Sequence, residues 1–146
     1  MKGKADKAIK FFFLAKNIDI RERSRLKSFL VDLLRKEGKE ISFVNFIFCS
    51  DRYLLEINRQ YLSHDYYTDI ITFDLTPDAT LLEAEIYIST DRIRENAWKL
   101  GVPIKQETFR VMFHGLLHLA GYKDKTKKDR LEMRERESFY IQKYIS

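Results

Sequence analysis

The chain has 146 residues, 45% of them hydrophobic and 14% aromatic, with two prolines, five glycines and a single cysteine. This length and composition suit one domain with a buried core, and they exclude a disordered chain and a disulfide-stabilised scaffold. No run approaches the roughly 20 apolar residues of a membrane-spanning helix, so we expect a protein of the reducing cytoplasm that does not bind membranes.

The net charge of +5 is unevenly distributed along the chain. Residues 1–40 carry 12 Lys and Arg against 6 Asp and Glu, residues 41–90 carry 2 against 8, and residues 91–146 carry 13 against 8. A basic beginning and end around an acidic middle suit a polyanionic partner that meets one face. Solvated, lysine-rich helices would give the same distribution, so charge alone favours neither explanation.

Helices and strands alternate in the first part of the chain, and helices dominate the second. The patterns predict strands over 10–15, 41–48, 69–74 and 84–89, with a turn near Pro77 and Asp78 between the last two. Helices are predicted over 22–37, ending at Gly38, from an Asp51 cap to Leu62, over 90–100, from Pro103 to near Gly121, and over 127–144. The predicted fold is a single α+β domain over 1–146, with a small mixed sheet of about four strands packed by about five helices.

The segment 107–124, with the sequence ETFRVMFHGLLHLAGYKD, contains the residues that point to chemistry. Its apolar residues follow the spacing of a buried helix face, whereas His114 and His118 stand four residues apart on another face. Two imidazoles one helical turn apart can point at one metal ion. Gly121 is suited to end the helix and turn the chain back, which would bring the Asp124 carboxylate to the same place. The pattern predicts a metal site at the C-terminal end of this helix.

The order H-x-x-x-H-x-x-G-x-x-D repeats the ligand spacing of a known group of zinc sites, with Asp in the third position. Three protein ligands leave a fourth position for water, as in catalytic zinc sites. Manganese, nickel and iron also suit this ligand set. Zinc peptidases place their general base, a Glu, directly after the first His, and Gly115 occupies that position here. Two ordinary histidines on a helix are the simpler explanation, and a structural metal site is another.

Three segments resemble one family. HGLLHLAGYKD resembles the H-G-x-L-H-L-x-G-Y-D-H signature of the YbeY endoribonucleases, with Lys123 in place of the Asp and Asp124 in place of the third His. INRQYLSHDYYTDIITFD and AEIYIS are similar to two further segments of that family, in the same order along the chain. The resemblance spans roughly residues 45–135.

This resemblance implies a cytoplasmic, metal-dependent and single-strand-specific endoribonuclease. It implies a role in maturing the 3′ end of small-subunit ribosomal RNA and in ribosome quality control, so ribosomal RNA and the small subunit are the expected partners. One zinc ion per chain is expected on His114, His118 and Asp124, and Arg59 is expected to contact the phosphate. The expected catalytic residues are Arg59, His114 and His118.

Other interpretations stay open at this stage. A ribosome-associated binding factor without catalysis, or a zinc peptidase, would fit some of the same features. Glu107 either supports a ligand imidazole or forms an ion pair with Arg110, and Asp69 is expected to brace a strand. Three tyrosines suit stacking on unpaired bases or core packing: Tyr61, Tyr66 and Tyr67. The basic segment 123–130 suits an RNA backbone or plain solvation.

Overall fold

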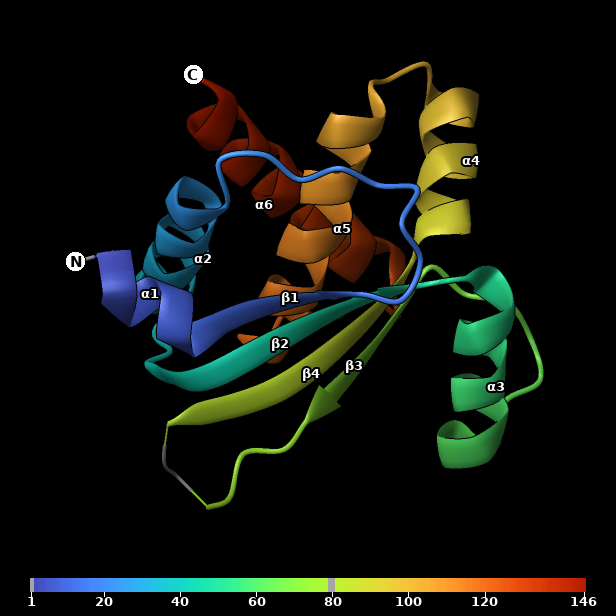
Figure 1. Cartoon of the computed structure of the whole chain (residues 1–146), viewed down its shortest axis with the longest axis horizontal. Coiled ribbons are helices and arrows are strands. Elements are labelled where there is room, and N and C mark those ends of the chain that lie inside the picture. The colour runs from blue at the N-terminus through green and yellow to red at the C-terminus, as the bar shows by residue number, and fades with distance from the viewer. Residues whose placement is uncertain (1, 79–80) are drawn as a thin grey trace.

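The computed structural model describes residues 2–78 and 81–146 (Figure 1). The helices are α1 (Lys2–Ala8), α2 (Arg23–Lys36), α3 (Asp51–Leu62), α4 (Thr90–Leu100), α5 (Ile104–Leu119) and α6 (Lys127–Ile145). The strands are β1 (Ile9–Phe13), β2 (Ile41–Cys49), β3 (Ile70–Asp74) and β4 (Leu82–Ser89). These elements confirm the predicted α+β class.

The four strands form one mixed sheet in the order β1-β2-β4-β3. β1 and β4 flank β2 in parallel, and β3 pairs with β4 in the antiparallel direction. Parallel neighbours need a crossover connection, and α2 supplies it between β1 and β2. The central strand β2 is rich in aromatic and β-branched residues, in keeping with its burial against both neighbours.

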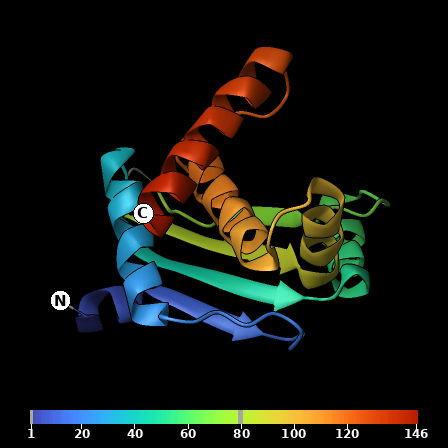
Figure 2. The same cartoon turned by 90° about the horizontal axis from the view of Figure 1, so that it is seen from above.

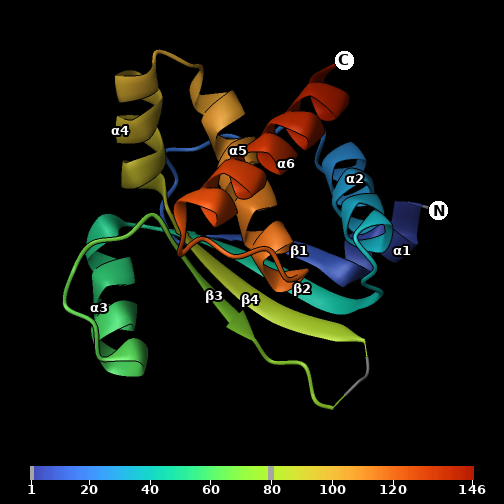
Figure 3. The same cartoon turned by 180° about the vertical axis from the view of Figure 1, so that it is seen from behind.

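The helices cover the two faces of the sheet unequally. α2, α4, α5 and α6 lie on one face, and α3 lies at one end of the other (Figures 1 and 3). The larger core joins the inner strand residues Phe46 and Ile86 to Leu30 of α2 and Phe113 of α5. The smaller core, of Cys49, Leu54 and Ile71, lies beneath α3. α5 therefore lies directly on the sheet, with α6 crossing it on the outside (Figure 2).

Two features differ from the sequence prediction. The described residues form six helices rather than about five, because α1 precedes the first strand. Seven residues offer too few positions for a helical period to be visible, and α1 is stabilised by packing on α2, where the Ser24 hydroxyl donates to Asp6 at 3.3 Å. The cap of α3 is Ser50 rather than Asp51, since the Ser50 side chain accepts from the Tyr53 amide at 3.1 Å.

Several smaller predictions can be compared directly. Cys49 is free and buried, as predicted. The predicted turn near Pro77 and Asp78 lies at the edge of a connection whose residues 79–80 fall outside the described residues.

In the part of the chain that the structure covers, no helix combines the length and apolar character needed to cross a bilayer.

Candidate metal and RNA site

The helix α5 brings the predicted site residues close to the sheet. Gly115 is buried against β3 and β4, and a Cβ atom built there would lie 2.9 Å from Ile70 Cδ1 and 3.2 Å from Ile86 Cδ1. Glycine therefore permits an approach that a side chain would prevent. The neighbouring His114 is half-buried at the edge of this contact.

His114 is held by a buried carboxylate of α6. Its Nδ1 lies 2.5 Å from Glu137 Oε2, and Glu137 is 1% exposed. Because a carboxylate accepts a hydrogen bond from Nδ1–H, the neutral imidazole has its lone pair on Nε2. Nε2 lies 3.8 Å from Asp124 Oδ2. A carboxylate on the ring nitrogen opposite the metal is the usual arrangement that fixes the tautomer of a metal-binding histidine, and Glu137 occupies that position here.

Arg110 connects this pair to two further carboxylates. Its guanidinium donates to Glu107 at 2.8 and 2.6 Å and to Glu137 Oε1 at 3.2 Å, and its Nη2 lies 3.8 Å from Asp69 Oδ2. The ion pair that the sequence suggested between Glu107 and Arg110 is confirmed. Asp69 also braces the sheet, because its carbonyl accepts from the Ser89 amide at 2.9 Å.

The cluster carries more negative than positive charge. It contains four carboxylates and one guanidinium: Asp69, Glu107 and Glu137 lie against Arg110, and Asp124 faces His114. Burial alone would lower the pKa of His114, but the hydrogen bond and charge of Glu137, with Asp69 and Asp124, raise it above its ordinary value. The surplus negative charge favours a cation at Nε2. A proton and a metal ion would compete for the lone pair of this nitrogen.

The three predicted ligands are only partly assembled. His114 and Asp124 face each other, whereas His118 is exposed one turn further along α5. Within residues 2–78 and 81–146, no three or more His, Cys, Asp and Glu side chains form a set that could hold a metal ion. The donor chemistry of His114 and Asp124 fits a divalent transition metal, and the complete three-ligand site stays a prediction.

Asp124 owes its place to the end of α5. Gly121 has a φ of 114°, in the region that favours glycine, as predicted. Its amide bonds to the His118 carbonyl at 3.0 Å, and the Tyr122 amide bonds to the Leu117 carbonyl at 3.0 Å. These two bonds form a Schellman motif, which turns the chain back along the helix towards His114.

Arg59 lies on α3, away from these ligands. It is exposed and forms an ion pair with Asp65, and no hydrogen bond or ion pair within the described part of the chain joins it to His114, His118 or Asp124. The preceding Asn58 is buried, and its amide donates to the Tyr66 carbonyl at 2.9 Å, which fixes the loop before β3. Arg59 is therefore exposed beside this loop, and its contact with the phosphate stays a prediction.

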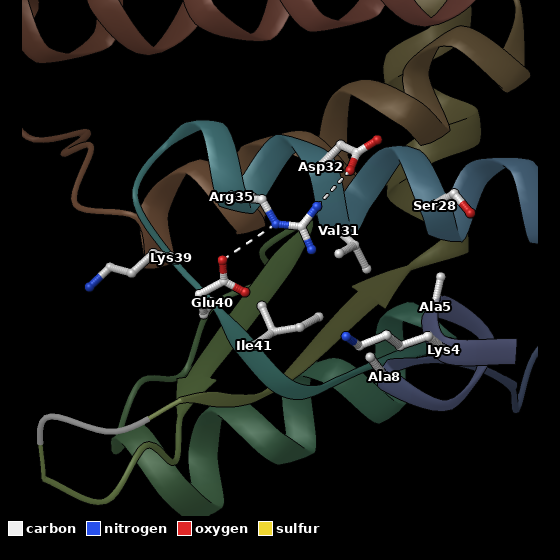
Figure 4. Close-up of a pocket in the computed structure, with 10 residues that line it drawn as sticks. All are labelled: Lys4, Ala5, Ala8, Ser28, Val31, Asp32, Arg35, Lys39, Glu40 and Ile41. Atoms are coloured by element: carbon white, nitrogen blue, oxygen red, sulfur yellow. Dashed lines mark hydrogen bonds and ion pairs between the residues drawn. The ribbon is translucent and has the colours of Figure 1, made fainter. Parts of the chain in front are cut away.

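A cavity of about 250 Å³ lies elsewhere, between α1, α2 and the start of β2 (Figure 4). Its most polar group, Arg35, is paired with Asp32 at 3.1 Å and Glu40 at 3.4 Å. The ten lining residues that the structure describes include none of the predicted site residues. This cavity is therefore separate from the histidine cluster.

Glu137 is the functional residue that the sequence analysis missed. A local signal was present, because Met133, Glu137, Tyr140 and Tyr144 share the helical spacing of the buried face of α6. A carboxylate among apolar core positions needs a partner. That partner is 23 residues away in the sequence, so the pairing itself was not visible there.

Comparisons with known proteins agree with the fold and with the motif. The model of the family described as endoribonuclease YbeY matches residues 13–145. A Cytophaga hutchinsonii protein of that name is 46% identical over 132 residues, covering 90% of this chain and 92% of the relative. One from Bacteroides thetaiotaomicron is 43% identical, covering 82% and 86%. A solution structure from Thermotoga maritima shares 28% identity, with a TM-score of 0.63, over 93% of this chain and 88% of its own. The chain therefore belongs to the endoribonuclease YbeY family.

Proposed function

We propose that this protein is a metal-dependent endoribonuclease that hydrolyses single-stranded RNA at a site formed by His114, His118 and Asp124. The observation that carries the proposal is the orientation of His114, whose Nδ1 is held by Glu137 while Nε2 is turned towards Asp124. Family membership over residues 13–145 supports the reaction class.

Zinc is the proposed metal, one ion per chain. A bound ion would supply an acidified water and neutralise charge on a phosphoryl oxygen. The chain's own contribution is a negatively charged, preoriented cluster in which Glu137 selects the neutral tautomer of His114 that has its lone pair on Nε2, the nitrogen that would bind the metal. Because His118 is exposed and not packed in the core, its ring is free to turn towards the same ion.

RNA would be held by surface groups outside this cluster. The guanidinium of Arg59 is exposed, and it would exchange its Asp65 partner for a phosphate oxygen. Tyr61, Tyr66 and Tyr67 are 60%, 57% and 56% exposed, which suits stacking on unpaired bases better than core packing. Ribosomal RNA of the small subunit, in the cytoplasm, is the proposed substrate.

The peptidase alternative meets a steric obstacle. A Glu in place of Gly115 would have to extend from a Cβ that already lies within 3.3 Å of both Ile70 and Ile86. The general base of zinc peptidases would therefore require these two side chains to shift. The remaining alternative is a binding factor that associates with the small subunit without cleaving RNA.

The proposal is tested with a fluorescent single-stranded RNA and the same RNA in a duplex. We expect the protein to cleave only the single strand, to lose activity with a chelator and to regain it with zinc. His114→Ala should lower the rate by about 100-fold or more. The matched control is Glu135→Ala, which removes an exposed side chain of α6 outside the cluster.

Cleavage by His114→Ala at the wild-type rate would rule out the proposed site. The binding-factor alternative predicts that wild-type protein leaves the RNA intact and that His114→Ala still sediments with small subunits.

A further inference from the structure

A half-buried carboxylate at the C-terminal end of α2 contacts the turn that precedes Asp124. Glu37 ends α2, and its side chain is 9% exposed. It accepts from the Tyr122 hydroxyl at 2.9 Å, from Arg136 Nη2 at 3.1 Å and from the Tyr140 hydroxyl. One carboxylate therefore joins α2, α6 and the segment that follows α5.

Tyr122 is the member of this cluster that lies in the turn. Its hydroxyl donates to Glu37 Oε1 and accepts from Arg136 Nε at 3.1 Å, so it is held from two sides. The chain continues from Tyr122 to Asp124 in only two residues. The position of the Tyr122 backbone therefore limits where the Asp124 carboxylate can lie.

The segment is also held by the bond from the Tyr122 amide to the Leu117 carbonyl and by the packing of Tyr122 on the core. Residues 122–124 belong to no helix or strand, and regular structure resumes at the Thr126 cap of α6, where Thr126 and Asp129 form a capping box. An open hollow of about 510 Å³ lies beside the segment, lined by Glu37, Tyr122 and Lys123 among others. Asp124 itself has a side chain that is 48% exposed. The Tyr122 side chain thus ties the segment to Glu37 and to α6, in addition to the backbone bonds that close α5.

We propose that Glu37 and Tyr122 are positioning residues that hold Asp124 in front of His114 and thereby raise the affinity of the site for zinc. This inference rests on the proposed metal site. Glu37 lies 87 positions before Asp124 in the sequence, and it acts through Tyr122 without touching the metal. Groups that orient metal ligands in this way typically change metal affinity by roughly 10- to 100-fold.

The test compares two variants, each of which lacks one of the tyrosine hydroxyls that donate to Glu37. Tyr122→Phe removes the hydroxyl bonds that join the turn to Glu37 and Arg136, whereas Tyr140→Phe removes a hydroxyl of α6 and leaves the Tyr122 bonds in place. Zinc affinity is measured by competition with a chromophoric chelator, at a temperature where circular dichroism shows each variant folded. The absorption intensity of bound cobalt(II) reports the ligand geometry in the same proteins.

We expect Tyr122→Phe to weaken zinc binding by about tenfold or more and to change the cobalt spectrum. Tyr140→Phe should lower thermal stability but leave zinc affinity within about twofold. Equal affinities of wild type and Tyr122→Phe, or equal losses in both variants, would overturn the positioning role. Asp124→Ala tests the metal site separately from the positioning role. If zinc binding is unchanged by that substitution, Asp124 is not a ligand and the proposed metal site is wrong.

Discussion

The Glu137 carboxylate lies 2.5 Å from Nδ1 of His114, joining the middle of α6 to the helix that carries the predicted metal ligands. Glu137 is buried, and its other oxygen accepts from Arg110 at 3.2 Å. A buried carboxylate with both oxygens engaged has little freedom to turn. His114 is therefore presented to Asp124 in one orientation by the packing of α6 on α5.

Glu137→Gln tests this orientation. The amide keeps the size of the side chain but removes the negative charge that favours an Nδ1–H tautomer. We expect zinc affinity to fall by roughly 10- to 100-fold, measured by chelator competition. Glu135→Gln is the matched control, because Glu135 lies on the same helix and is exposed. Unchanged affinity in Glu137→Gln would mean that the charge of Glu137 has no bearing on the metal.

Gly115→Val tests the close approach of α5 to the sheet. The added atoms would collide with Ile70 and Ile86, so we expect the free energy of unfolding to fall by about 1–3 kcal/mol in urea titrations. Gly3→Val is the control, since a Cβ at Gly3 meets nothing within 4 Å. Its effect should stay within about 0.5 kcal/mol. Equal effects of the two substitutions would contradict the steric account.

The sequence predicted the main elements well because their signals are local. The α5 helix shows a continuous apolar face, and four strands follow β-branched or aromatic runs bounded by turns. The α1 helix was missed because its stability depends on α2 rather than on its own seven residues. Ser50 and Asp51 are both good capping residues, and only the tertiary pairing of Asp51 with Arg92 at 2.8 Å decides between them.

The candidate site was predictable only where its residues share one helix or its end. The spacing of His114 and His118 and the bend at Gly121 are local features. Glu137 and Glu37 reach the site from other helices, so their roles depend on the packing of α6 and α2. Likewise, the sequence suggested no pairing for Arg59, which the structure joins to Asp65 in the loop before β3.

Glu37 gives a pH-dependent contribution to stability. Burial would raise its pKa, but hydrogen bonds from Tyr140 and Tyr122 and the charge of Arg136 lower it below 4.5. A lowered folded-state pKa stabilises the protein above about pH 5, and this stabilisation is lost as the pH falls through the folded-state value. Glu37→Gln should therefore cost about 1–3 kcal/mol of unfolding free energy at pH 7 and less near pH 3. Urea titrations at both pH values measure this difference. An equal cost at both would contradict the role of the charge.

Cys49 provides a probe of the smaller core. Burial, with added repulsion from Asp51 and Asp91, raises the pKa of its thiol from 9.0 to about 12. A shift of this size lowers the thiolate fraction about a thousandfold at neutral pH. We expect native protein to react with a thiol reagent far more slowly than urea-unfolded protein. Comparable rates in the two states would show that the core beneath α3 opens readily.

The metal site is tested most directly by elemental analysis of purified wild-type, His114→Ala, Asp124→Ala and His64→Ala proteins after dialysis against zinc. We predict about one zinc ion per folded chain in the wild type and in His64→Ala, and markedly less in the other two. The same zinc content in all four proteins, whether one ion or none, would contradict a metal centre at His114 and Asp124.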